Sequence, residues 1–127
     1  MLTWERFITR KQDFTRAGCN ANAPRPGGCT KPRPYERFDW TDDGCSWTPG
    51  YLARRFNGPC QQHDFGYRNF GKGLTLERTE DRRAWIDARF LAEMYRICSG
   101  FGASAGTCRA EAYGMWSAVR RFNDWRD

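Results

Sequence analysis

Six cysteines limit what this chain can fold into more than any other feature of its sequence. They lie at positions 19, 29, 45, 60, 98 and 108, and no two of them have the C-x-x-C spacing of a zinc knuckle. An even count without such close pairs favours three disulfides formed in an oxidising compartment. Among the possible pairings, sequence order favours the local ones, Cys19–Cys29, Cys45–Cys60 and Cys98–Cys108. The alternative is a cytosolic protein with free, buried cysteines.

Length and composition are those of one small folded domain. The chain has 127 residues, of which 39% are hydrophobic and 16% aromatic, so it can bury a modest core. No apolar run approaches the ~20 residues that a transmembrane helix requires. The first residues, MLTWERFITRK, lack the apolar core of a signal peptide. We therefore expect a mature or truncated form with an added Met.

Helical signals dominate the chain, and strand signals are nearly absent. We predict a short helix at about 3–14, a Pro- and Gly-rich loop at 18–34, two longer helices at about 59–70 and 77–98, and a last helix at about 109–122. These elements predict an all-α fold with disulfide-stapled loops.

His63, the only histidine of the chain, lies in the stretch CQQHDFGYRNF. On a helical wheel, His63 falls inside an apolar arc with Tyr67 and Phe70, and Asp64 falls at the edge of the same arc. The other side of this helix is predicted to face solvent. That side carries Gln61, Gln62, Arg68 and Asn69.

An acid interrupts the apolar stripe of the second long helix. Apolar residues recur three and four positions apart at Ala84, Leu91, Met94 and Cys98. Asp87 completes this series. An ionised carboxylate at such a position is costly unless it is paired and hydrogen-bonded. The natural partner is the histidine of the facing helix, although such a pair can also be purely structural.

Asp64 remains as a second acid beside that pair, and a second acid there favours a cation. Ca²⁺ takes carboxylate and backbone carbonyl oxygens as ligands. The segment TDDGC offers both, through the carboxylate of Asp43 and the carbonyl of Gly44. A Cys45–Cys60 disulfide would hold this segment about one helical turn before Asp64. Asp42 is a weaker ligand candidate, and it can also be interpreted as an acid on the surface that is merely solvated.

Three separated segments match one family in order. CQQHDFGYRNF resembles the Cys-x-x-His-Asp helix of the secreted phospholipase A2 enzymes of bacteria and fungi. FDWTDDGC resembles the calcium-loop segment before that helix, and WIDARFLAEMYRIC resembles the second catalytic helix. The resemblance covers about Phe38 to Cys108, and FITRK near the start is a weaker similarity to the fungal members.

The resemblance implies a reaction and a role for each candidate residue. It implies two antiparallel catalytic helices, a calcium loop and Ca²⁺-dependent hydrolysis of the sn-2 ester of glycerophospholipids. His63 matches the general base, and Asp87 matches the acid that orients it. Asp43 and Asp64 match the calcium carboxylates, and Gly44 matches the position that supplies a carbonyl oxygen.

The role of Tyr67 and the extent of the domain are predicted less specifically. Tyr67 lies one turn after His63, where it is placed either to hydrogen-bond Asp87 or to act as a core aromatic residue. We predict a single phospholipase A2-like domain over 1–127. Within it, 1–37 form a basic N-terminal helix and the Cys19–Cys29 loop, and 38–122 form the catalytic core. That loop and the short basic stretch YLARRF depart from the family pattern.

The net charge of +6 favours an anionic partner, although it also fits a merely soluble basic surface. Residues 1–37 contain eight Lys/Arg and three Asp/Glu. We expect a secreted monomer that acts at an anionic phospholipid membrane and not on nucleic acid. Arg54 and Arg55 would contact the lipid surface, and Trp47 and Tyr51 would lie at the head groups. Alternatively, Trp47 packs against the Cys45–Cys60 disulfide.

Two rival functions fit parts of the sequence. One is a catalytically weak phospholipase-like toxin that perturbs membranes or binds a receptor. The other is a disulfide-rich secreted protein that binds nucleic acid or another partner, and it leaves the buried Asp87 without explanation. Phospholipid turnover with and without EGTA separates the three readings.

Overall fold

The protein is represented by a computed structural model that describes residues 39, 43–45, 47–72, 75–121 and 125. The described part is all-α, as predicted, and contains no strand. Its elements are α3 (Gly50–Arg55), α4 (Asn57–Gly66), η2 (Tyr67–Gly71), α5 (Glu80–Cys98), η3 (Ser99–Ser104) and α6 (Ala105–Arg121). The predicted helix at 3–14, the loop at 18–34, the Cys19–Cys29 disulfide and Asp42 lie outside the described residues.

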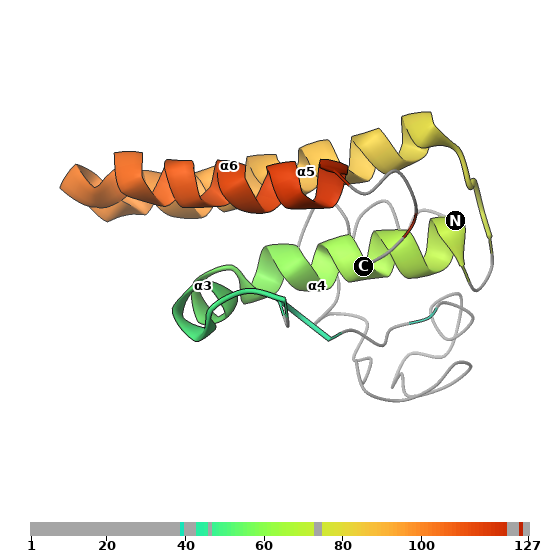
Figure 1. Cartoon of the computed structure of the whole chain (residues 1–127), viewed down its shortest axis with the longest axis horizontal. Coiled ribbons are helices and arrows are strands. Elements are labelled where there is room, and N and C mark those ends of the chain that lie inside the picture. The colour runs from blue at the N-terminus through green and yellow to red at the C-terminus, as the bar shows by residue number, and fades with distance from the viewer. Residues whose placement is uncertain (1–38, 40–42, 46, 73–74, 122–124, 126–127) are drawn as a thin grey trace.

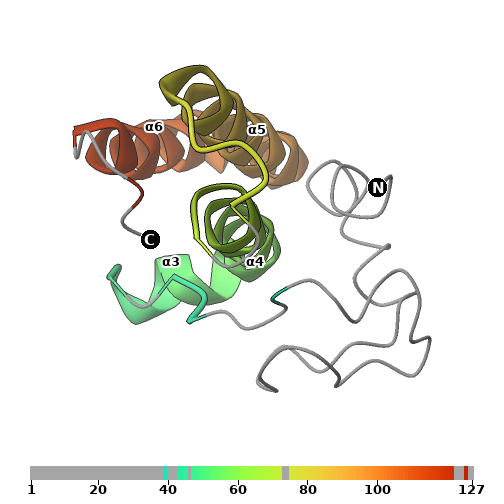
Figure 2. The same ribbon diagram turned by 90° about the vertical axis from the view of Figure 1, so that its right-hand side faces the viewer.

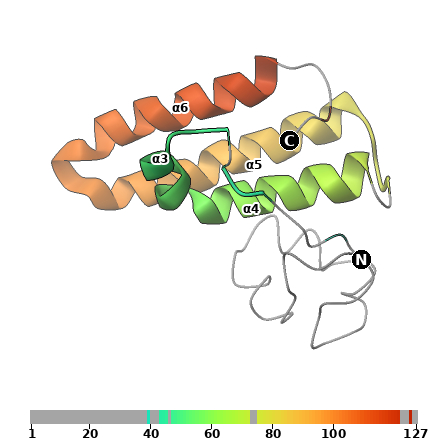
Figure 3. The same ribbon diagram turned by 60° about the horizontal axis from the view of Figure 1, so that its bottom comes forward.

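The three long helices α4, α5 and α6 lie side by side along the longest axis of the molecule (Figure 1). α5 runs antiparallel to α4 and to α6 (Figure 1). Figure 3, in which the bottom of the molecule comes forward, shows α5 between the other two helices. Viewed end-on, α4 has α5 and α6 on one side and the short helix α3 on the other (Figure 2). This arrangement places the middle of α4 against the first half of α5.

α5 ends at Cys98 as predicted, but α5 and α6 begin at other residues than helical periodicity indicated. α5 begins at Glu80 and not near Glu77, since the hydroxyl of Thr79 accepts a hydrogen bond from the backbone N–H of Arg82 at 3.1 Å. Glu80 and Asp81 then lie in the first turn, where acidic side chains favour the helix dipole. α6 begins at Ala105, four residues before the predicted start.

The helix predicted at 59–70 is divided in the structure, and a short helix precedes it. α3 forms from the basic stretch that was assigned to no helix, and α4 ends at Gly66. The five-residue π-helical segment η2 continues from it to Gly71. π-helical turns are rare in proteins, and those that occur are often found at functional sites.

The prediction that Gln62 and Asn69 face solvent is wrong. Their exposed fractions are 4% and 0%, and Gln61 and Arg68 are partly buried. The wheel assumed one apolar face, whereas α4 is covered on more than one side (Figure 2). On the side away from α5, the amide of Asn69 donates to the carbonyl of Asp39 at 2.9 Å and accepts from its N–H at 2.8 Å.

Close contact between α4 and α5 depends on a glycine. Gly66 faces Ile86, and a Cβ built on Gly66 would lie 2.9 Å from Cγ2 of that side chain. One turn further, the ring of Trp125 covers Gly71 so closely that a Cβ there would overlap it. The absence of side chains at these two positions lets α5 and the C-terminal segment pack directly on the helix that carries His63.

Two disulfides hold the ends of this helical unit. Cys45–Cys60 ties the loop before α3 to α4, and Cys98–Cys108 ties α5 to α6 across the turn η3. Both are among the three pairings favoured by sequence order. Their sulfurs join a core with Phe56, Phe90 and Met94. No helix of the described residues is long and apolar enough to cross a membrane.

Candidate active site

The His63 and Asp87 side chains meet between α4 and α5. Nε2 of His63 lies 2.8 Å from Oδ1 of Asp87, and the exposed fractions of the two side chains are 4% and 0%. The imidazole ring packs between the rings of Tyr67 and Phe90, with centroid distances of 4.2 and 4.7 Å. Two aromatic contacts and one carboxylate therefore restrict the orientation of the histidine.

Tyr67 reaches the same carboxylate oxygen as the histidine. Its hydroxyl donates to Oδ1 of Asp87 at 2.6 Å, and its side chain is fully buried. Burial, followed by the negative charge and the hydrogen bond of Asp87, raises the pKa of Tyr67 far above its usual value of 10.0. The phenol therefore stays protonated at neutral pH and donates to Asp87.

Two arginines that sequence reasoning did not single out face the second oxygen of Asp87. Nη1 of Arg120, from α6, donates to Oδ2 at 2.7 Å. Nη1 of Arg83 lies 3.7 Å from the same oxygen. Arg83 is one turn before Asp87 on α5 and could have been found from that spacing. Arg120 could not, because only the packing of α6 on α5 brings it there.

Asp87 is held in its ionised form although it has no contact with solvent. Burial by itself would raise the pKa of Asp87, but hydrogen bonds from His63, Tyr67 and Arg120 outweigh burial and hold it below the usual value of 3.8. An ionised carboxylate only accepts hydrogen bonds, so Nε2 of His63 carries the hydrogen. The other ring nitrogen, Nδ1, then bears the lone pair that could take a proton from water.

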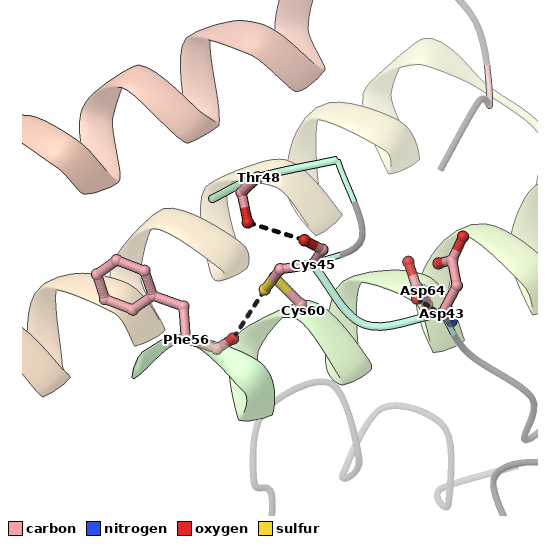
Figure 4. The surroundings of a disulfide bond; sticks show 6 residues. All are labelled: Asp43, Cys45, Thr48, Phe56, Cys60 and Asp64. Carbon is pink, nitrogen blue, oxygen red and sulfur yellow. Dashed lines mark hydrogen bonds between the residues drawn. A yellow bond between two sulfur atoms is a disulfide. The ribbon is translucent and has the colours of Figure 1, made fainter. Parts of the chain in front are cut away.

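Asp64 follows His63 on α4 and lies beside the loop that precedes α3. Its side chain is 2% exposed, and its Oδ2 accepts a hydrogen bond from the backbone N–H of Asp43 at 3.0 Å. Figure 4 shows Asp43 and Asp64 side by side, next to the Cys45–Cys60 disulfide that anchors the loop to α4. Gly44, between Asp43 and Cys45 in the chain, has a φ of 61°, a conformation that glycine adopts without strain.

The carboxylate of Asp43 points to the surface. Its side chain is 48% exposed, and its Oδ1 lies 3.5 Å from Nη2 of Arg68. Among the described residues, no group of three or more His, Cys, Asp or Glu side chains converges on one point. A cation here would therefore depend on one or two carboxylates together with backbone carbonyls and water.

Comparison with known proteins identifies the family. The family model described as prokaryotic phospholipase A2 matches residues 29–123, which is most of the chain. The chain belongs to the prokaryotic phospholipase A2 family. This match includes the loop of Asp43, the α4 pair His63 and Asp64, and Asp87 of α5. It also includes the part of α6 that carries Arg120.

Two fungal proteins are similar to parts of the chain. A secretory phospholipase A2 of Arthroderma benhamiae is 46% identical over 68 residues, which are 50% of this chain and 42% of that protein. A secretory phospholipase A2 of Beauveria bassiana is 34% identical over 88 residues, 68% of this chain and 45% of that protein. The chain thus spans less than half the length of these curated relatives.

Proposed function

We propose that this chain hydrolyses the sn-2 acyl ester of glycerophospholipids in the presence of Ca²⁺, releasing a fatty acid and a lysophospholipid. The proposal rests mainly on the buried hydrogen bond between His63 and Asp87 in a member of the prokaryotic phospholipase A2 family. A second support is the buried Asp64 next to that histidine, beside a loop that can offer carbonyl oxygens.

His63 is the proposed general base. Nδ1 takes a proton from water, and the water oxygen attacks the ester carbonyl. The positive charge that develops on the ring is stabilised by Asp87, which accepts from Nε2 at 2.8 Å. The same proton later passes to the leaving alcohol oxygen. This is the base and orienter pair of a hydrolase triad, with water in place of a serine.

The residues around Asp64 fit a calcium ion in their chemistry. Ca²⁺ prefers hard oxygen ligands, and the carboxylates of Asp64 and Asp43 and the carbonyl of Gly44 are of this type. The hydrogen bond from Asp43 to Asp64 brings the loop to the acid on α4. When bound there, calcium would supply positive charge for the substrate phosphate and for the oxyanion. Water would complete the ligand set.

The proposed substrate surface is an anionic membrane, reached by a secreted, single-domain monomer. Two relatives carry the word secretory in their names, and the disulfides Cys45–Cys60 and Cys98–Cys108 fit an oxidising compartment. Trp47 and Tyr51 are 41% and 51% exposed. Trp47 is therefore available to lipid head groups rather than enclosed against the disulfide beside it.

The base assignment is tested by His63→Asn in a phospholipid hydrolysis assay with positional analysis of the product. We expect turnover to fall by at least ~10²-fold, because general base catalysis contributes about 10²–10⁴. Circular dichroism should show an intact fold. A folded His63→Asn protein that hydrolyses phospholipid at the original rate contradicts the proposal. A wild-type chain without any phospholipid turnover would favour the toxin or binding-protein alternatives.

The metal assignment is tested by Asp64→Asn and by chelation. Asp64→Asn should abolish Ca²⁺ binding and Asp43→Asn should only weaken it, because the Asp64 carboxylate is buried and that of Asp43 is half exposed. Calcium titration by calorimetry measures this directly, with Asp81→Asn as an exposed acid on α5 for comparison. Full activity in EGTA would rule out a calcium requirement.

A further inference from the structure

We propose that Arg120 of α6 is a positioning residue of the hydrolytic centre, which holds Asp87 and, through Asp87, fixes the ring of His63. This inference rests on the proposed function. It assigns a role to the last turn of α6, which lies outside the three segments that carry the family resemblance. No contact of Arg120 with the substrate is required.

The Asp87 carboxylate divides its two oxygens between different helices. Oδ1 accepts from His63 of α4 at 2.8 Å and from Tyr67 of η2 at 2.6 Å. Oδ2 accepts from Arg120 of α6 at 2.7 Å. A carboxylate bonded through one oxygen can rotate about its Cβ–Cγ bond. Because Arg120 holds the opposite oxygen, it fixes the plane of the carboxylate and keeps Oδ1 directed at the imidazole.

Arg83 does not replace Arg120 in this role. It lies 3.7 Å from Oδ2, too far for a hydrogen bond. Its guanidinium donates to the carbonyl of Val119 at 3.2 Å, to Oε1 of Glu80 at 2.8 Å and, at 3.4 Å, to the hydroxyl of Tyr67 rather than to Asp87 itself. We assign Arg83 a supporting role, since these bonds join the start of α5 to the end of α6.

Glu80 fixes the guanidinium of Arg120. A second nitrogen of that group, Nη2, pairs with Oε2 of Glu80, while Nη1 donates to Asp87. The pKa of Arg120 is raised because hydrogen bonds to Asp87 and Glu80 outweigh the effect of burial, so the group stays charged. A guanidinium can bridge two acids in this way because its donors are planar and lie in fixed directions.

The first experiment compares Arg120→Gln with Arg121→Gln. Arg121 is the next residue of α6, is exposed and has the same charge, so it is the matched control. We expect Arg120→Gln to lower kcat by about 10–100-fold, the range for a partner that orients a reacting group from outside. KM and the Ca²⁺ affinity should stay unchanged. Arg121→Gln should keep the original kcat, and Arg120→Lys, which retains the charge, should recover part of the loss.

The second experiment separates positioning from simple stabilisation. If Arg120 acts only through Asp87, Arg120→Gln should cost nothing further in kcat when it is added to Asp87→Asn. Independent, additive losses would overturn the proposal, as would a full kcat in folded Arg120→Gln. Arg120→Met, which keeps the aliphatic stem, is judged by the same two criteria if the Gln variant is unfolded at the assay temperature. A catalytically normal His63→Asn would instead refute the proposed function.

Discussion

At the scale of single residues, the proposed hydrolytic centre is built around the carboxylate of Asp87, which is fully buried. Asp87 accepts from His63 and Tyr67 on one oxygen and from Arg120 on the other. A buried carboxylate is unfavourable unless such partners replace its water. Each donor also removes a degree of freedom from the acid, so the groups that stabilise its charge are those that orient it for the histidine.

The lowered pKa of Asp87 makes part of the stability dependent on pH. A carboxyl whose pKa is lower in the folded state adds stability above its unfolded pKa, and this stability is lost as pH falls through the folded pKa. We expect Asp87→Asn to cost about 1–3 kcal/mol of unfolding free energy at neutral pH. The difference from wild type should narrow as pH decreases below 3.8, the usual value for this group.

Urea unfolding at several pH values, with the disulfides intact, measures that difference. Asp81→Asn on the same helix is the control, because its carboxylate is exposed in the first turn of α5. A gap between wild type and Asp87→Asn that stays constant down to pH 2 would show that the carboxylate is not held ionised by its partners.

At the scale of elements, the spacing between α4 and α5 sets the distance between base and acid. Gly66 is one turn after His63 along α4, and it faces Ile86, the residue before Asp87. This contact lets the two helices approach closely at the level of the His63–Asp87 hydrogen bond. A larger residue at 66 would separate the helices where the bond is formed.

Gly66→Ala should therefore destabilise the fold and reduce activity. The added Cβ meets Ile86 at 2.9 Å, and overpacking a core contact of this kind costs about 1–3 kcal/mol. The control is Gly114→Ala on α6, where a Cβ meets nothing within 4 Å. That change should stabilise the helix by about 0.5–1 kcal/mol. Thermal unfolding of the two variants distinguishes them, and equal melting temperatures would contradict the close-packing account.

At the scale of the whole molecule, basic charge and exposed aromatic side chains occur near one another. Tyr51 donates to Glu111 at 2.7 Å, and Arg55 pairs with the same carboxylate at 2.6 Å. Arg55 also lies 4.9 Å above the ring of Phe101. Arg55 is thus held by the protein, and exposed Arg54 is the better placed of the two to meet a lipid phosphate.

Binding to anionic vesicles should accordingly fall as salt concentration rises, because the screening length shortens to ~3 Å at 1 M. Arg54→Gln should weaken binding by about fivefold, which corresponds to ~1 kcal/mol for one basic residue near the surface. Arg121→Gln is the control for charge alone. A sedimentation assay with neutral and anionic vesicles measures both effects. If binding changes neither with salt concentration nor with the charge of the lipid, the net charge of +6 does not serve membrane binding.

Much of the fold and of the candidate site followed from local patterns. Helical periodicity predicted the two long helices and placed His63 and Asp87 on their facing apolar sides, and local sequence order favoured Cys45–Cys60 and Cys98–Cys108. These features are set by residues within a few turns of one another, or by a charge that cannot be buried alone. Sequence is sufficient to predict these features because helical periodicity, short cysteine spacing and an acid in an apolar stripe can each be read directly from it.

Tertiary structure alone decided what covers each helix and what meets the far oxygen of Asp87. Gln62 and Asn69 look like surface residues on a wheel, yet they are buried because α4 is enclosed on more than one side. Arg120 is 33 residues from Asp87 in the chain and reaches it only through the packing of α6 on α5. No local pattern encodes such a contact, since its energy depends on the relative placement of whole helices.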